Sequence, residues 1–380
     1  MDFHLSEEQS ILREMVRDFA RKEIEPIAAE SDQTHRFPSD TLKKAAALGL
    51  MGVTVAPEYG GSGMDFLSYI LVLEEIAKSC ASTAVVLSVH NTLGCGTLHK
   101  FGNEEQKKRW LPLAASGEAL GAYLLTEPGA GSDASSLACR AEKVEGGWKV
   151  TGSKAFITNA GYASFGILYA RTDVNEKSRG ISAFILDMNS EGVEPGPEEA
   201  KMGLNASSTV MVNLDDVFIS EDCLLGEEGR GFSMALDMLN YGRIGIAAQA
   251  LGMAEAALDE SLKYSREREQ FGKPIGQFQS IQDKLTAMYS DVEASRLLTY
   301  RAAVAASAGE NIIMPAATAK LFSSQAAVRC AEAAVQIHGG YGYSKEYKVE
   351  RIFRDARVTE IYEGTSEVQR LVMARQLLDM

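Results

Sequence analysis

The spacing of hydrophobic residues changes twice along the chain, and residues 1–118 carry the first pattern. Ser6 followed three positions later by Gln9 is typical of a helix start, and helical spacing then continues through Ile11, Met15, Val16 and Phe19. Residues 69–87 form an apolar stretch long enough for a buried pair of helices. We therefore expect an N-terminal all-helical domain over residues 1–118.

A different pattern occupies residues 119–228. Short runs that alternate or are wholly apolar stand between turn residues, for example at 148–152, 166–170 and 181–186. No helical pattern separates these runs, so they favour an antiparallel sheet or barrel over strands joined by helices. We expect a central β domain here.

Helical spacing returns over residues 229–380. Residues 244–257, 281–306 and 314–335 carry apolar or small side chains around most of the helix circumference, which is typical of helices buried on more than one side. This predicts a second helical bundle whose outer faces also pack against other copies of the chain. The expected fold class is therefore α+β with several domains.

Composition limits the kinds of partner that the protein can have. The chain of 380 residues is 46% hydrophobic and 24% charged, which is typical of a globular protein with more than one core. Its net charge of −14 disfavours nucleic acid and anionic membrane surfaces as partners. An anionic ligand would need local arginines, lysines or helix N-termini to hold it.

Cysteine spacing and the N-terminal sequence indicate the compartment. The cysteines are scattered and never form a Cys-x-x-Cys pair, which argues against a disulfide framework and a zinc site; they are Cys80, Cys95, Cys139, Cys223 and Cys330. The first residues lack the basic start and apolar core of a signal peptide, and no apolar run is long enough to span a bilayer. We expect a mature cytoplasmic protein with no membrane span.

Several segments allow two interpretations from the residues alone. The glycines at 129–131 follow an expected strand and suit either a simple turn or close approach to a cofactor. Phe156 suits a core position, Arg268 suits a solvated helix end, and residues 90–92 suit helix packing. No Gly-x-Gly-x-x-Gly turn with a later acidic residue is present, so a nicotinamide cofactor is disfavoured.

The C-terminal segment 361–367 also has a purely structural interpretation. Ser366 and Gln369 have the spacing of a capping box for the last helix, and Glu363 could then simply complement the N-terminus of that helix. The five histidines show no metal-ligand spacing, so we expect no metal.

Three short segments far apart along the chain carry distinctive motifs. Residues 125–133 read Leu-Thr-Glu-Pro-Gly-Ala-Gly-Ser-Asp, residues 336–343 read Gln-Ile-His-Gly-Gly-Tyr-Gly-Tyr, and residues 361–367 read Ile-Tyr-Glu-Gly-Thr-Ser-Glu. Together these segments resemble the acyl-CoA dehydrogenases from end to end. The resemblance implies a C-terminal four-helix bundle and a homotetrameric FAD enzyme that removes two hydrogens across the Cα–Cβ bond of an acyl-CoA thioester. It also implies that electrons pass to an electron-transfer flavoprotein.

The resemblance assigns roles to particular residues. Glu363 matches the catalytic base that takes the α-proton, and Thr126 matches a hydrogen-bond donor to the isoalloxazine ring. The residues that match flavin contacts are Tyr123, Leu125, Thr126, Gly131, Ser132, Phe156, Ile157, Thr158, Thr365, Ser366 and Glu367. A second set matches segments that reach the cofactor of a neighbouring subunit, namely Arg268, Phe271, Gln279, Gln336, Ile337, His338, Gly339 and Gly340. The matches to substrate contacts are Ser132, Asn240, Arg243, Tyr362, Glu363 and Gly364.

Departures from the family pattern bear on the branch. Gly242 occupies the position at which some branches place the base, so Glu363 is the expected base and a straight-chain substrate is favoured. Phe156 stands where many relatives have Trp, and Asn240 stands where Asp is common. Residues 243–252 resemble short-chain, butyryl-type members. A branched or alicyclic acyl-CoA, an oxidase and a non-catalytic flavoprotein scaffold stay open as competing interpretations.

Overall fold

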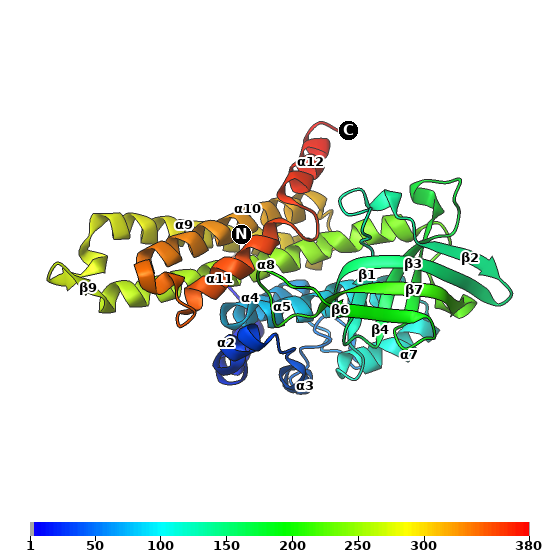
Figure 1. The fold of residues 1–380 in the computed structure, drawn as a ribbon, viewed down its shortest axis with the longest axis horizontal. Helices are drawn as coiled ribbons and strands as arrows, with labels where there is room; N and C mark the ends of the chain where they lie inside the picture. The colour runs from blue at the N-terminus through cyan, green and yellow to red at the C-terminus, as the bar shows by residue number, and fades with distance from the viewer. Residues whose placement is uncertain (1–3, 380) are drawn as a thin grey trace.

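The computed structural model describes residues 4–379, and its helices and strands fall into three groups along the chain (Figure 1). The first group is helical. It consists of α1 (Glu7–Phe19), the π-helix η1 (Ala20–Ile24), α2 (Glu25–Thr34), α3 (Ser39–Ala47), the 3-10 turn η2 (Pro57–Tyr59), α4 (Phe66–Ser79), α5 (Ala81–Ser88), the π-helix η3 (Val89–Cys95), α6 (Gly96–Phe101) and α7 (Glu104–Ala115).

The start of α1 has the cap that the sequence predicts. Ser6 Oγ accepts from the backbone N–H of Gln9 at 3.1 Å, and the Gln9 side chain accepts from the backbone N–H of Ser6 at 3.1 Å. These bonds satisfy two backbone donors that a helix start leaves unpaired. The buried pair predicted over residues 69–87 is also confirmed, because α4 and α5 are buried along most of their length.

An eight-stranded sheet follows the helices. Its strands are β1 (Gly121–Leu124), β2 (Arg140–Val144), β3 (Gly147–Thr158), β4 (Phe165–Arg171), β5 (Ile181–Asp187), β6 (Val193–Glu198), β7 (Thr209–Ser220) and β8 (Leu224–Leu225), with short 3-10 turns η4 (Ala134–Ser136), η5 (Ser178–Gly180) and η6 (Glu221–Cys223) between them. The order in the sheet is β6-β7-β3-β2-β4-β5-β8, with β1 on β4. The strands predicted at 148–152, 166–170 and 181–186 lie within β3, β4 and β5.

The prediction of an antiparallel sheet is right for most pairs, but β2 pairs with β4 in parallel at Arg140, and β1 runs parallel to β4 along its whole length. A parallel pair needs a long connection between its strands. Here the connection is the loop after β1 together with β2 and β3, which the local pattern of the sequence does not relate to β1. The sheet is therefore mixed, and β1 joins it beside the N-terminal helices.

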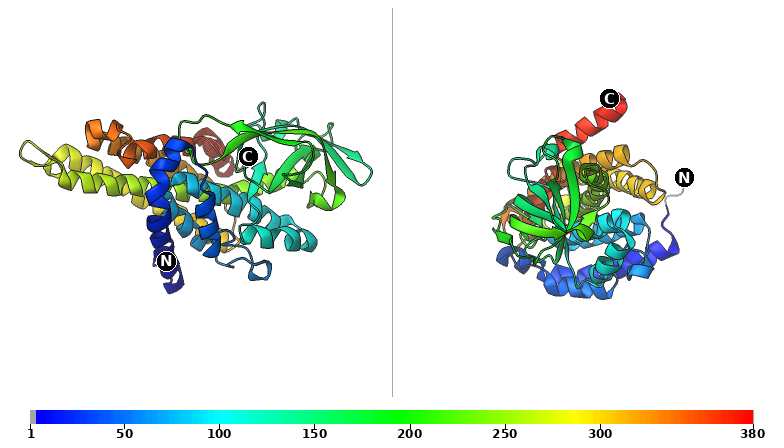
Figure 2. Two further views of the ribbon diagram at one scale, coloured as in Figure 1. Left: turned by 60° about the horizontal axis from the view of Figure 1, so that its bottom comes forward. Right: turned by 90° about the vertical axis from the view of Figure 1, so that its right-hand side faces the viewer.

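The third group contains the longest helices. It comprises α8 (Gly231–Glu267), the hairpin β9 (Glu269–Gln270) and β10 (Lys273–Pro274), η7 (Ile275–Gln277), α9 (Gln279–Ser307), α10 (Ile313–His338), η8 (Gly339–Tyr343), α11 (Lys348–Ala356), η9 (Arg357–Glu360) and α12 (Ser366–Leu377). Helices α8, α9, α10 and α11 pack together, whereas α12 projects from the bundle (Figures 1 and 2). At about 1.5 Å per residue, α8 is about 55 Å long.

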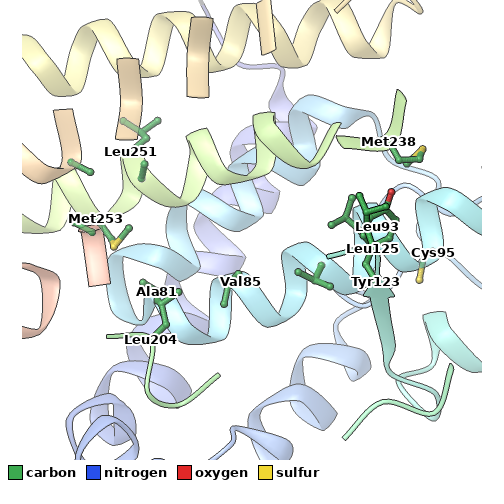
Figure 3. Packing of buried hydrophobic residues seen from close by; sticks show 14 of the residues in the cluster. Ala81, Val85, Leu93, Cys95, Tyr123, Leu125, Leu204, Met238, Leu251 and Met253 are labelled. Carbon is green, nitrogen blue, oxygen red and sulfur yellow. The ribbon is translucent and has the colours of Figure 1, made fainter. Parts of the chain in front are cut away.

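Helix α8 of the third group packs against both of the other groups. It packs against α4 and α5 of the first group and against β5 of the sheet. Figure 3 shows one shared hydrophobic cluster in which Leu93 lies beside Tyr123 and Leu125, with Met238 of α8 close by. The part of the sheet that carries β1 thus lies against α8, since Tyr123 of β1 donates to the Ala235 carbonyl of α8.

The connections between groups run over residues 116–120 and 226–230. We propose that the expected domain limits at 118/119 and 228/229 fall there. Within residues 4–379, no helix combines the length and the apolarity that crossing a bilayer requires.

Candidate active site

Glu363 lies in a tight turn between η9 and α12 that has an unusual backbone. Both Glu363 and Gly364 have positive φ, 52° and 96°. For a residue other than glycine this conformation costs about 1–2 kcal/mol, so other contacts must hold it. Arg243 Nε donates to the carbonyl of Glu363 at 3.3 Å, Lys320 Nζ donates to the carbonyl of Gly364 at 2.7 Å, and Gln369 Nε2 donates to the same Gly364 carbonyl at 2.8 Å.

The capping box predicted for the last helix is wrong. The N-cap of α12 is Thr365, whose side chain accepts from the backbone N–H of Val368 at 3.3 Å, and Ser366 is already the first residue of the helix. Gln369 does not reach back to a cap because its amide binds the carbonyl of Gly364. The side chain therefore fixes the turn that holds Glu363.

The carboxyl group of Glu363 has the properties of a general base. Its Oε2 atom is buried and has no hydrogen-bond partner among the described residues. Burial raises the pKa of Glu363 to about 7, against the opposing effect of the charges on Lys320 and Arg243. Gly242 makes the space, since a Cβ there would stand 2.2 Å from Oε2. A carboxylate with a free oxygen and a pKa near neutrality is well suited to proton abstraction.

The backbone N–H of Glu363 is a second free group. It donates to no other group in the part of the chain that the structure describes. A free N–H beside a base is a suitable donor to an oxygen on which negative charge develops.

The loop after β1 presents an open face. The hydroxyl of half-buried Thr126 has no partner in the described chain, and a Cβ built on Gly129 or Gly131 would meet nothing within 4 Å. Phe156 is 66% exposed and has a φ of 56°, so its interpretation as a core aromatic is wrong. A free hydroxyl, open glycines and an outward aromatic ring could accept a flat aromatic ligand, and the flavin contacts expected here stay a prediction.

Other predicted flavin contacts have buried side chains. Tyr123, Leu125 and Ile157 belong to the hydrophobic clusters, and the Tyr123 hydroxyl donates to the carbonyl of Ala235 at 3.4 Å. These three residues can offer a ligand mainly their backbone. Of the remaining predicted contacts, Thr158 is half-buried, Ser132 and Glu367 are exposed, and Ser366 is buried.

The second predicted cofactor segment lies at the far end of α8. A cavity of about 550 Å³ is lined there by Arg268, His338, Gly339 and Gly340, among others. Arg268 lies over the Tyr341 ring at 5.7 Å and Phe271 is 94% exposed. The predicted contacts Gln279 and Gln336 are also exposed, whereas Ile337 and His338 are buried.

One copy of the chain does not bring these two segments together. Arg243, beside Glu363, and Arg268 are separated by about seven turns of α8, or about 37 Å. Figure 1 shows β9, next to Arg268, at the end of the bundle opposite the sheet. The two parts can form one site only if different copies of the chain contribute them.

The predicted substrate contacts on α8 bind each other. Asn240 Oδ1 accepts from Arg243 Nη1 at 2.8 Å, and both residues are buried. Asn240 thus supplies a neutral acceptor where an Asp would supply a charged one. The hydroxyl of Tyr362 donates to Gln249, whereas Oε2 of Glu363 has no partner among the described residues.

Sequence reasoning missed the residues that support the site. Lys154 is fully buried, donates to Glu127 at 2.7 Å and lies beneath the loop that carries Thr126. Lys320 and Gln369 hold the Glu363 turn. A charged residue within the small and apolar run 316–322 was the available signal for Lys320. Residues 90–92 have a packing role, because His90 Nδ1 accepts from the Gly121 N–H at 3.0 Å and the Asn91 side chain binds backbone groups.

Comparisons with known proteins cover the whole chain. Family models for the N-terminal, middle and C-terminal domains of acyl-CoA dehydrogenase match residues 6–118, 122–217 and 229–378. An acyl-CoA dehydrogenase of Bacillus subtilis is 50% identical over 375 residues, which cover 99% of this chain and 99% of the relative. A short-chain specific acyl-CoA dehydrogenase of Clostridium acetobutylicum is 45% identical over 377 residues, which cover 99% of this chain and 100% of the relative. The solved structure of butyryl-CoA dehydrogenase from Megasphaera elsdenii is similar with a TM-score of 0.98 and 44% identity, with 100% of both chains covered.

Proposed function

The chain belongs to the acyl-CoA dehydrogenase family, and we propose that it oxidises a short-chain acyl-CoA to the trans-2-enoyl-CoA with Glu363 as the base. It is a flavin-dependent oxidoreductase that uses FAD, like its family. The observation that carries the proposal is the Glu363 carboxyl, whose buried Oε2 has no partner among residues 4–379.

The residues around Glu363 suit removal of a weakly acidic α-proton. The carboxylate takes the proton from the carbon next to the thioester carbonyl, and the N–H of Glu363 donates to the thioester oxygen as enolate charge develops there. FAD, when bound, would supply the acceptor for the β-hydrogen, which would leave as hydride. Arg243, Lys320 and Gln369 keep the turn in the strained conformation that presents the carboxylate and the N–H together.

The loop after β1 and the strand β3 would hold the flavin ring. Thr126 would donate its free hydroxyl to the ring, Phe156 would lie against it, and the open glycines would let the backbone approach. Arg268 and residues 336–340 lie too far away to serve the same site in one chain, so a second copy would supply them. This supports a homotetramer, in line with the bundle faces that expose Tyr289, Leu297 and Val304.

A short-chain substrate is favoured by the named relatives and by residues 243–252. One extra methylene changes binding in an apolar pocket by about 1–3 kcal/mol, so a branched or alicyclic acyl-CoA is the nearest competing substrate. As the family resemblance implies, the electron acceptor we propose is an electron-transfer flavoprotein. We place the protein in the reducing cytoplasm, since its cysteines are free thiols.

A panel of acyl-CoAs tests the substrate class. The purified FAD-loaded protein is mixed anaerobically with butyryl-CoA and then with longer, branched and alicyclic thioesters, while the visible flavin band is followed. Fastest bleaching by butyryl-CoA and onward reduction of an electron-transfer flavoprotein support the proposal. Fastest bleaching by a branched or alicyclic thioester assigns that substrate instead.

The same assay distinguishes the dehydrogenase from an oxidase and from a non-catalytic flavoprotein scaffold. Rapid peroxide release under air, without an acceptor flavoprotein, identifies an oxidase. A flavin that no thioester bleaches identifies a scaffold. The carboxyl of Glu363, whose Oε2 has no partner among the described residues, argues against the scaffold, because holding a flavin does not require a free base.

A further inference from the structure

Two lysines of the chain are completely buried, and they differ in how their charge is balanced. Lys154 and Lys320 both have 0% exposure. Lys154 forms an ion pair with Glu127 at 2.7 Å. For Lys320 Nζ, no carboxylate oxygen in the described chain lies within the 4.0 Å of an ion pair, and its acceptor is the carbonyl of Gly364 at 2.7 Å. An unpaired buried ammonium is costly, so packing alone does not account for it.

Lys320 lies where its charge can act on Glu363. The Gly364 carbonyl that it binds follows directly after Glu363, so the ammonium lies next to the turn that carries the base. Burial lowers the pKa of Lys320 to about 8, and the Glu363 charge is the strongest influence that opposes this effect. Conversely, Lys320 and Arg243 both lower the pKa of Glu363, and the charge on Lys320 has the larger effect.

The absence of direct contact matters for the chemistry. An ammonium bound to the carboxylate would occupy an oxygen that proton abstraction needs. From beyond ion-pair distance, the positive charge still favours the ionised carboxyl, while Oε2 stays free of partners within the described residues.

We propose that Lys320 is a positioning residue for the reaction. Its ammonium holds the Glu363–Gly364 turn through the Gly364 carbonyl and keeps the Glu363 carboxyl ionised without pairing with it. This inference rests on the proposed role of Glu363 as base, and it assigns to α10 a part in the chemistry.

Other groups face this pair and contribute to the same balance. Arg243 from α8 adds positive charge, whereas Glu360 of η9 and Glu367 of α12 add negative charge near Lys320. Burial raises the pKa values of three tyrosines, and the charge on Glu363 adds to this effect; they are Tyr69, Tyr123 and Tyr362. All of these groups are kept in the test, so that only the charge at 320 changes.

The test compares pH profiles of anaerobic flavin reduction by butyryl-CoA. Lys320→Met removes the charge and the hydrogen bond, Lys320→Arg keeps both, and Lys43→Met removes a charge from a side chain that is 78% exposed. We expect Lys320→Met to move the acid limb of kcat/KM upward by about one pH unit, which costs about tenfold at pH 6 and less than about twofold at pH 9. In Lys320→Arg and Lys43→Met, the acid limb of the kcat/KM profile should stay at the pH of the parent.

A second readout needs no turnover. The protonation of Glu363 is followed by infrared difference spectra between each form and the same form carrying Glu363→Gln, across the same pH range. We expect Lys320→Met to raise the midpoint of the Glu363 carboxyl by the same amount as the kinetic limb. If Lys320→Met does not fold, the neutral variant Lys320→Gln replaces it.

The outcomes separate this inference from the proposed function. If folded, FAD-loaded Lys320→Met keeps both the acid limb of the kcat/KM profile and the titration midpoint of Glu363, the inference is overturned. A loss of rate that is equal at every pH also overturns it, because a packing role gives that result. A parent protein that no acyl-CoA bleaches overturns the proposed function instead.

Discussion

Gly242 gives the sharpest test of the geometry around Glu363. The space beside its Cα is filled by the carboxyl of Glu363, and a Cβ at 242 would stand 2.2 Å from Oε2 and 3.0 Å from Cδ. In Gly242→Ala the carboxyl must therefore withdraw by about 1 Å to reach an ordinary contact distance. A displacement of about 1 Å can cost about a hundredfold in rate, or about 2.7 kcal/mol of transition-state stabilisation.

The fold should not share this loss. Gly242 is in the interior of α8, where alanine is favoured over glycine by about 0.5–1 kcal/mol. We therefore expect Gly242→Ala to lose about a hundredfold in kcat/KM while its melting temperature stays at or above that of the parent. The assay is anaerobic flavin reduction by butyryl-CoA, alongside thermal unfolding and the flavin content of each form.

A matched substitution controls for the effect of adding a methyl group. The Cβ of Gly94→Ala would meet its neighbours no closer than 3.4 Å, so the variant should keep its rate within about threefold of the parent. A Gly242→Ala enzyme as fast as Gly94→Ala would contradict this expectation, because the carboxyl of Glu363 would then not need the position that the structure gives it.

Three further predictions follow from buried charges and exposed contacts. Burial raises the pKa of Glu363 from 4.5 to about 7, so the folded protein binds this proton more tightly than the unfolded chain and loses stability as pH rises between these values. Glu363→Gln should therefore raise the melting temperature at pH 8 and not at pH 4.5. An equal change at both pH values would contradict this expectation. Lys154→Met should lower the free energy of unfolding in urea by about 3–5 kcal/mol, because it leaves the buried Glu127 carboxylate without its ion-pair partner. Adding Glu127→Gln to the same chain should recover part of the loss. A loss below about 1 kcal/mol would show that the ion pair is dispensable. Arg268→Ala should leave the melting temperature of the FAD-free protein unchanged, since Arg268 has no ion pair within the described chain. The same variant should retain less FAD on gel filtration. Full retention of FAD would exclude Arg268 from the cofactor site.

Elements defined by local spacing could be predicted from the sequence. The cap of α1, the helix pair α4 and α5, and the strands within β3, β4 and β5 all appear where the hydrophobic period places them. The resemblance carried by three short segments is confirmed over the whole chain by the family models. These features depend on residues that are close in sequence.

Features that depend on distant residues could not be predicted in this way. The parallel pairing of β1 with β4 joins strands separated by two others, and the capping box predicted at Ser366 fails because Gln369 binds the Gly364 carbonyl instead. The hydrogen bond from Lys320 to that carbonyl spans 44 residues of sequence. Local patterns give no information about such contacts, although they determine the conformation of the residue that we propose as the base.

The role of Glu363 is tested most directly by anaerobic stopped-flow mixing of butyryl-CoA with the FAD-loaded parent and with Glu363→Gln. General bases typically contribute about 10²–10⁴-fold, so we expect rapid bleaching of the flavin band in the parent and bleaching at least about a hundredfold slower in the variant at equal flavin content. Bleaching of Glu363→Gln at the parent rate would contradict it, because the α-proton would then be taken by another group.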